Sequence, residues 1–456
     1  MRGRPTWQLS GIVLGFLLVA ASPARDPLTA AKQQDWELLR ELLDGGANPN
    51  AGAPDGTTAL HWASYWDRLD AARLLIDAGA DVNAETDLGV TPLWPAAQNG
   101  SAGMVDLLLK AGADPRATLP SGETLVMTAA LTGNAEVVSR LLDAGGDPNG
   151  SGTRQQTALM WAAGEGHSEV VAVLLEHGAD VSARTAVRRQ YMKTEKEQES
   201  NPEYHVWLDM GGSTALMFAA RSGHLEAAKH LVAAGADVNE PNGFGITPII
   251  MAVHGGNPEL VAYLLEAGAD PNLAEAGYSA LHAAILHGSI ASVEALLAHG
   301  ADVNAPLERP TPTRRGSDDF HFHNAFVGAT PFWLAARFTQ PDVMRLLLEH
   351  GADPLFVLDC RYPAGDKENQ WEEVEGPITT VMAAVGMGGV RINRGFHRPR
   401  GAELEQAMLE AVRIAAEAGV DIDATDALGQ SALDHATIRG YEAVAEYLTQ
   451  FGAKHD

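Results

Sequence analysis

The feature of this sequence that most limits its possible folds is a short phrase that recurs along the chain. The phrase reads Gly-Ala-Asp in most copies, and its glycine stands at 46, 79, 112, 145, 178, 235, 268, 300, 351, 419 and 452. Six of the ten intervals are 33 residues, one is 32, and the other three are 57, 51 and 68. A fixed period of this kind indicates stacked copies of one structural unit. Each long interval predicts one unit plus an insertion.

A second phrase lies between the glycines and predicts two short helices in each unit. It reads Thr157-Ala-Leu-Met in one unit and Thr91-Pro-Leu-Trp in another. Threonine suits a helix N-cap, and proline suits the first helical position, where its missing N–H costs nothing. We therefore expect a first helix over 157–165 and a second over 169–176, with Gly178 as the left-handed residue after the second. Neither helix can bury its apolar stripe alone, so neighbouring units must stack.

These two phrases resemble the ankyrin repeat, whose signature is T-P-L-H-x-A at a period of 33 residues. The resemblance covers roughly residues 28–456 and implies an all-α ankyrin-repeat solenoid, with helix-turn-helix units joined by β-turn or hairpin loops. The expected organisation is a signal peptide (1–24), an array (28–456) that begins with a partial cap (28–50), and ten repeats near 52–84, 85–117, 118–150, 151–183, 212–240, 243–273, 275–305, 328–355, 377–424 and 426–456.

The N-terminus predicts export. Arg2 and Arg4 precede an apolar run over 9–21 and small residues suited to cleavage after Ala21 or Ala24, which together form a secretory signal pattern. The run is too short to span a bilayer. Cys360 is the only cysteine, so an intramolecular disulfide framework is excluded. We expect a protein of the bacterial periplasm or a secreted protein, with no membrane insertion after cleavage.

Four insertions interrupt the period, at 184–211, 306–327, 356–376 and 388–401. We expect each to lie between stacked units, and residues 193–202 to be solvated and mobile. His321 and His323 suggest a metal site, although a polar loop is the favoured interpretation because no further ligands are defined. The arginines of 391–400 either hold an anion or pair with the acidic residues of 372–375.

No catalytic motif accompanies the repeats. Cys360 has no placed base beside it, and we interpret it as a bystander thiol. The net charge of −27 repels phosphate backbones, which argues against nucleic acid as a partner. We therefore expect a monomer that is not an enzyme and has no cofactor. The leading interpretation, given next, is a scaffold that binds another protein. Two alternatives stay open: the insertions bind a small ligand or a metal, or the chain is a purely structural spacer in the cell envelope.

The resemblance implies that another protein binds along a concave groove. The positions just before the glycine that ends each first helix should face this groove. They include large aromatic residues and arginines, which dominate interface hot spots. The predicted binding residues are Tyr65, Trp66, Gln98, Asn99, Leu131, Thr132, Glu165, Arg221, Ser222, His254, Leu286, His287, Arg337, Phe338, Met387, Ile438 and Arg439.

Overall fold

The structure is a computed structural model that describes residues 26–193, 205–311, 322–364, 372–388 and 401–453. The chain divides into two compact units, residues 1–114 and 115–456. The signal peptide expected over 1–24 lies outside the described residues.

The first unit contains three helix pairs among its described residues. The odd-numbered helices contact one another in order, and so do the even-numbered helices, which gives two layers. The segment expected as a partial cap contains both helices of a pair, although its first helix has only six residues. The pairs are α1 (Pro27–Lys32) with α2 (Trp36–Asp44), α3 (Ala59–Tyr65) with α4 (Leu69–Asp77), and α5 (Leu93–Gln98) with α6 (Ala102–Lys110).

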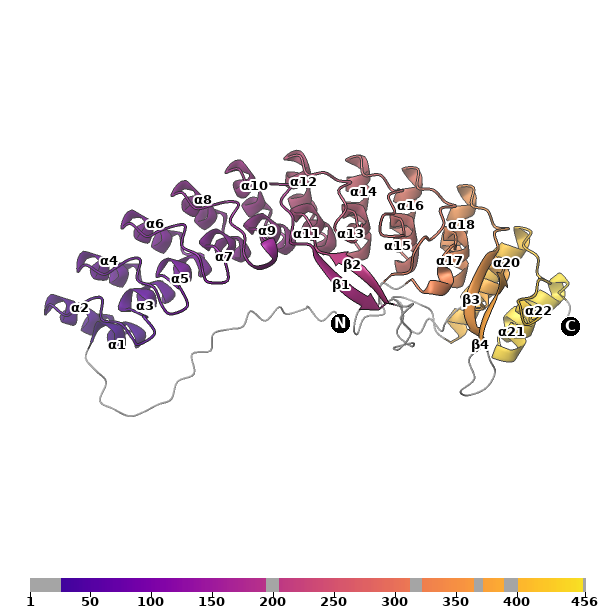
Figure 1. Ribbon diagram of the computed structural model, residues 1–456, viewed down its shortest axis with the longest axis horizontal. Helices are drawn as coiled ribbons and strands as arrows, with labels where there is room; N and C mark the ends of the chain where they lie inside the picture. The colour runs from indigo at the N-terminus through magenta and orange to yellow at the C-terminus, as the bar shows by residue number, and fades with distance from the viewer. Residues whose placement is uncertain (1–25, 194–204, 312–321, 365–371, 389–400, 454–456) are drawn as a thin grey trace. The chain divides into compact units, whose positions relative to one another are not determined.

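The second unit continues the same pairing. Figure 1 shows its odd-numbered helices in one row and its even-numbered helices in another. The helices are α7 (Leu125–Thr132), α8 (Ala135–Asp143), α9 (Ala158–Glu165), α10 (Ser168–Glu176), α11 (Ala215–Ser222), α12 (Leu225–Ala233), α13 (Pro248–His254), α14 (Pro258–Glu266), α15 (Ala280–His287), α16 (Ile290–Ala298), α17 (Pro331–Arg337), α18 (Pro341–Glu349), α19 (Thr380–Ala384), α20 (Ala402–Glu417), α21 (Ala432–Arg439) and α22 (Glu442–Phe451), with 3-10 turns η1 (Thr153–Gln155) and η3 (Asn324–Phe326).

The helix boundaries follow the residue types in the two phrases. The Thr157 hydroxyl caps α9 by accepting a hydrogen bond from the backbone N–H of Met160 at 3.4 Å. Gly166 ends α9 with φ +82°, and Gly178 follows α10 with the same φ, in the left-handed region that glycine adopts without strain. Within α9, Ala162 and Ala163 are fully buried, and α9 contacts α7 and α11, the first helices of the two neighbouring pairs.

An asparagine ladder joins successive pairs on the side of the Gly-Ala-Asp turns. The Asn149 amide donates to the carbonyl of Gly178 at 3.0 Å, and its oxygen accepts from the Asp180 backbone N–H at 2.7 Å. The same two bonds recur at Asn50 and Asn83 in the first unit and at Asn239, Asn272 and Asn304 in the second. Each asparagine thus provides a hydrogen-bond partner for a backbone carbonyl and a backbone N–H of the next turn, which would otherwise bond only to water.

Two insertions contain β-hairpins. β1 (Arg188–Lys193) pairs antiparallel with β2 (His205–Met210), and β3 (Leu358–Ala364) pairs antiparallel with β4 (Glu372–Ile378). Figure 1 shows both hairpins on the side of the odd-numbered helices in the second unit. The helical solenoid is confirmed, and these hairpins are extended forms of the turns between helix pairs.

One insertion does not lie where we expected it. The segment 388–401 falls between α19 and α20, which contact each other as the two helices of one pair. The expectation that every insertion lies between units is therefore wrong for this segment. A turn between the helices of a pair is also at the surface, so it tolerates added length as a turn between pairs does.

Candidate interaction surfaces

The predicted binding residues of the first unit lie at the ends of α3 and α5 and are exposed. Tyr65 is 52% exposed and Trp66 is 37% exposed. Their rings lie 4.8 Å apart between centroids, and the Trp62 ring lies 5.7 Å from Tyr65 and 6.4 Å from Trp66. We call these three residues the aromatic cluster. The Asn99 amide donates to the Tyr65 carbonyl at 2.8 Å, which ties the end of α3 to the end of α5.

The aromatic cluster has the composition of a protein-binding hot spot. Tryptophan and tyrosine are enriched in such spots because one ring buries a large area with few rotatable bonds. The Lys32 ammonium lies 5.8 Å from the Trp62 ring centroid, within the range of a cation–π interaction. The cluster therefore offers a partner both apolar surface and a positive charge beside it.

The predicted residues of the second unit fall into three groups by exposure. Those at α9, α11 and α21 are exposed and those at α13 and α15 are half-buried, while α7 has one residue of each kind. The exposed residues are Thr132, Glu165, Arg221, Ser222, Ile438 and Arg439, and the half-buried residues are Leu131, His254, Leu286 and His287.

The remaining three predicted residues, Arg337, Phe338 and Met387, are buried, so the expectation that they face a partner is wrong. Residues of the second insertion cover the end of α17. The ring of Phe326 lies 5.9 Å from that of Phe338, and the Arg337 guanidinium lies 5.7 Å from the same Phe326 ring. Met387 is buried in the turn after α19, next to Gly388, which packs against Ile378.

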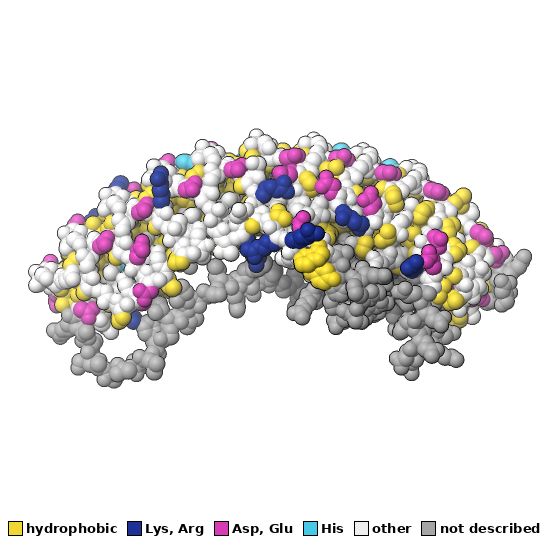
Figure 2. Space-filling model, in the orientation of Figure 1, with side chains coloured by type: hydrophobic (Ala, Val, Ile, Leu, Met, Phe, Trp, Pro, Cys, Tyr) yellow, Lys and Arg dark blue, Asp and Glu magenta, His cyan; other side chains and the backbone are white. Residues whose placement is uncertain are grey.

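The β1–β2 hairpin carries an exposed aromatic pair that the sequence-based list of binding residues missed. Tyr191 and Trp207 are cross-strand partners, with ring centroids 5.0 Å apart and exposures of 52% and 58%. The Arg189 guanidinium lies 5.9 Å from the Trp207 ring. Figure 2 shows hydrophobic and basic side chains side by side at this hairpin. The sequence did contain a signal for this surface. Arg189 and Tyr191 are two residues apart, and in a β-strand side chains with this spacing lie on the same face.

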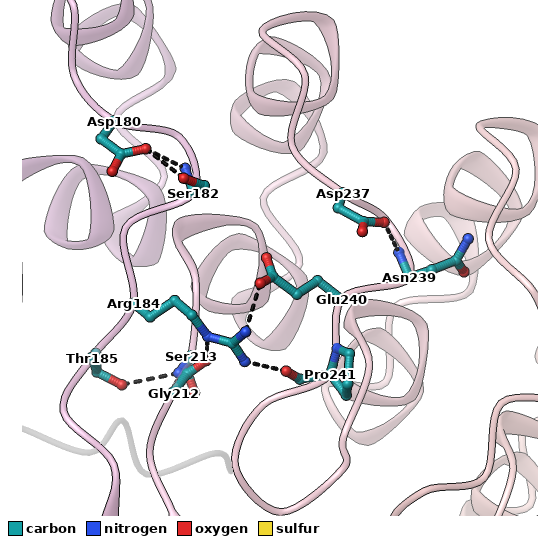
Figure 3. Close-up of polar contacts among 10 residues, drawn as sticks. All are labelled: Asp180, Ser182, Arg184, Thr185, Gly212, Ser213, Asp237, Asn239, Glu240 and Pro241. Carbon is teal, nitrogen blue, oxygen red and sulfur yellow. Dashed lines mark hydrogen bonds and ion pairs between the residues drawn. The ribbon is translucent and has the colours of Figure 1, made fainter.

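Arg184 anchors the base of this hairpin (Figure 3). Its guanidinium donates to the Gly212 carbonyl at 3.0 Å, to the Glu240 carboxylate at 2.6 Å and to the Pro241 carbonyl. The Thr185 hydroxyl accepts from the Ser213 backbone N–H at 3.0 Å. These bonds join the residues before β1 to those after β2 and to the turn beyond α12, so the hairpin has a fixed base in the second unit.

The residues considered for ligand chemistry have other roles or lie outside the described part. His323 accepts a hydrogen bond from the Ala325 backbone N–H at 3.1 Å and so caps η3, whereas His321 and the arginines of 391–400 are outside the described residues. Burial raises the pKa of the Cys360 thiol to about 12, so the reactive thiolate is scarce. Across the described ranges no group of three or more His, Cys, Asp or Glu is arranged to hold a metal ion.

A hollow between α18 and α20 is lined by charged and small residues. Arg345 lies there between the carboxylates of Asp342 and Glu410, so its positive charge is already compensated. The lining residues are Pro341, Asp342, Arg345, Ala402, Glu403, Gln406, Ala407 and Glu410. None of the described helices is both long and apolar enough to cross a membrane.

Helix pairs in two layers, joined by turns and stacked through small residues, define a solenoid of the ankyrin type. Family models agree: "Ankyrin repeats (3 copies)" matches residues 16–86, 93–185 and 216–306, "Ankyrin repeat" matches 327–359, and "Ankyrin repeats (many copies)" matches 402–449. The chain belongs to the ankyrin-repeat family. Proteins of this family are generally scaffolds for protein–protein interactions.

One of the similar solved structures is the human ASB11 ankyrin repeat domain. The two chains are 27% identical, with a TM-score of 0.43, and the match covers 55% of this chain and 100% of that one. A comparison with the curated proteins finds no match.

Proposed function

We propose that this ankyrin-repeat protein is exported and binds another protein, without catalysing a reaction of its own. The observation that carries the binding proposal is the aromatic cluster, in which Tyr65 and Trp66 are exposed and Trp62 is half-buried beneath them in ring contact. Contiguous exposed aromatic surface is uncommon on soluble proteins and marks interaction sites. The aromatic pair on the β1–β2 hairpin is a second such surface, in the second unit.

Export is supported by the basic and apolar pattern of the first 24 residues. The location we propose is the bacterial periplasm or the outside of the cell. N-terminal sequencing of the protein recovered from these compartments tests it, because cleavage after Ala21 or Ala24 would leave a new N-terminus at residue 22 or 25. A chain that retains Met1 and stays in the cytoplasm would contradict the proposal.

The aromatic cluster gives the first testable prediction. We expect Tyr65→Ala/Trp66→Ala to weaken binding at least tenfold, about 1.4 kcal/mol, because buried aromatic anchors contribute most of the free energy of an interface. The partner is first identified by crosslinking in the native cell envelope, and its affinity for the purified variants is then measured by calorimetry. Circular dichroism should show unchanged helical content.

Lys110→Ala is the matched control in the same unit. Lys110 lies on α6 and forms an exposed ion pair with Asp106, which contributes little to stability. Binding should be unchanged in this variant. If Lys110→Ala weakened binding and the aromatic double variant did not, the even-numbered helices would become the candidate surface.

A further inference from the structure

Two histidines of the second unit face each other at the ends of neighbouring helices. His254 is the last residue of α13, and His287 is the last residue of α15. The His254 Nδ1 atom lies 3.0 Å from the His287 Nε2 atom. Both side chains are half-buried. The stacking of two helix pairs thus brings together two imidazole nitrogens that are 33 residues apart in the sequence.

Tyr278 orients the first of these rings. Its hydroxyl oxygen lies 2.8 Å from the His254 Nε2 atom, on the opposite side of the ring from His287. Tyr278 is itself buried, and its ring lies 5.4 Å from that of Phe322. When Nε2–H donates to this hydroxyl, the Nδ1 lone pair of His254 points toward His287. Metal-binding histidines commonly have their second nitrogen held by such a partner.

We propose that His254 and His287 bind one divalent late transition-metal ion, Cu²⁺ most strongly. Imidazole nitrogens lie about 2.0–2.1 Å from such ions. Two nitrogens 3.0 Å apart would then subtend an angle of about 90° at the ion, which matches adjacent ligands in the square or tetragonal geometry of Cu²⁺ and Ni²⁺. Water fills the remaining positions.

The two facing nitrogens share one hydrogen. With His254 Nδ1 as the acceptor, His287 Nε2–H is the donor, so a metal ion takes the place of this hydrogen, which moves to the other ring nitrogen of His287. The acidic chain, with a net charge of −27, also raises the concentration of cations near its surface. The site is independent of the aromatic cluster, so protein binding and metal binding can fail separately.

The experiment is a titration of the purified full chain, without an affinity tag, with Cu²⁺, Zn²⁺ and Ni²⁺ against a competing chromophoric chelator at pH 7.5. We expect one tight Cu²⁺ per chain. His254→Ala and His287→Gln should each weaken it at least tenfold, with circular dichroism showing that the fold is retained. The electron paramagnetic resonance spectrum of the Cu²⁺ form should show coupling to two nitrogens that is lost in both variants.

His299→Ala is the matched control. His299 follows α16, is exposed, and has its Nδ1 atom 2.8 Å from the Ala295 carbonyl oxygen of its own helix. This variant should bind Cu²⁺ as the parent chain does. Unchanged affinity in either His254→Ala or His287→Gln, or two-nitrogen coupling that survives them, would overturn the proposal.

Discussion

At the residue scale, the histidine of the repeat phrase has a structural role as part of a helix cap. In the first unit, the Thr58 backbone N–H donates to His61 Nδ1 at 3.1 Å, so Nε2 carries the proton and donates to the Val90 carbonyl at 2.9 Å. In the second unit, the Ser279 backbone N–H donates to His282 Nδ1 at 3.2 Å. Because Nδ1 must accept, each cap requires a neutral imidazole.

His282 predicts a loss of stability in acid. Its burial lowers its pKa from 6.5 to about 4, so the unfolded chain binds the proton first as the pH falls. The stability that neutral His282 contributes is complete above pH 6.5 and declines between pH 6.5 and 4, by at most about 3 kcal/mol. Urea unfolding midpoints measured from pH 7.5 to 4.5 should therefore fall.

His282→Gln isolates this contribution, because glutamine at the third helical position can accept the same N-cap hydrogen bond without titrating. Its unfolding midpoint should fall less steeply with pH than that of the parent chain. His299→Gln, at an exposed position, should follow the parent chain. Identical pH profiles for all three proteins would show that His282 does not titrate as its burial implies.

At the element scale, Arg184 replaces a missing step of the asparagine ladder. Ser182 stands 33 residues after Asn149, where six units have asparagine and one has Arg116, and its side chain bonds to Asp180 of its own turn. Arg184 instead joins this turn to Glu240 and Pro241 beyond α12. The hairpin insertion separates the two helix pairs in sequence, and a longer side chain connects them at its base.

Removing this connection should destabilise the second unit. We expect Arg184→Ala to cost about 1–2 kcal/mol, because it loses charge-assisted hydrogen bonds at a partly exposed site. The readout is the urea midpoint of the full chain, followed by circular dichroism. Arg189→Ala, on the exposed face of the same hairpin, should leave the midpoint unchanged. An equal loss in both variants would mean that the hairpin as a whole, rather than its base, supports the array.

At the scale of the whole molecule, charge repulsion opposes folding. The chain carries 59 acidic and 32 basic residues, and a net charge far from zero destabilises a compact state. The ion pairs among the described residues are mostly exposed, such as Lys229–Glu226 and Arg361–Glu375, and exposed pairs contribute little. Salt should therefore screen more repulsion than attraction.

The expected result is a thermal midpoint that rises by a few degrees between roughly 10 mM and 150 mM sodium chloride, as the screening length shortens from about 30 Å to 8 Å. The measurement is a circular dichroism melt at pH 7.5, with sucrose at equal osmolality as the uncharged control. A midpoint that fell with salt would indicate that attractive ion pairs outweigh the net repulsion.

The repeat, the helix ends and the family could all be predicted from the sequence, because they depend on local rules. A threonine N-cap such as Thr157 and a left-handed glycine such as Gly178 act within one unit, and the 33-residue period shows that the units are equivalent. Exposure at Tyr65 and Trp66 also followed from their place at the end of a first helix.

Only the tertiary structure decided which surfaces stay open and which side chains meet. Phe326, from an insertion, buries Arg337 and Phe338, and strand pairing across an insertion brings Tyr191 to Trp207. The contact of His254 with His287 arises where two units stack. An insertion has no counterpart in the period, so nothing in the repeat specifies where its residues pack. That choice depends on apolar burial between segments far apart in the chain, which the local pattern of one unit does not contain.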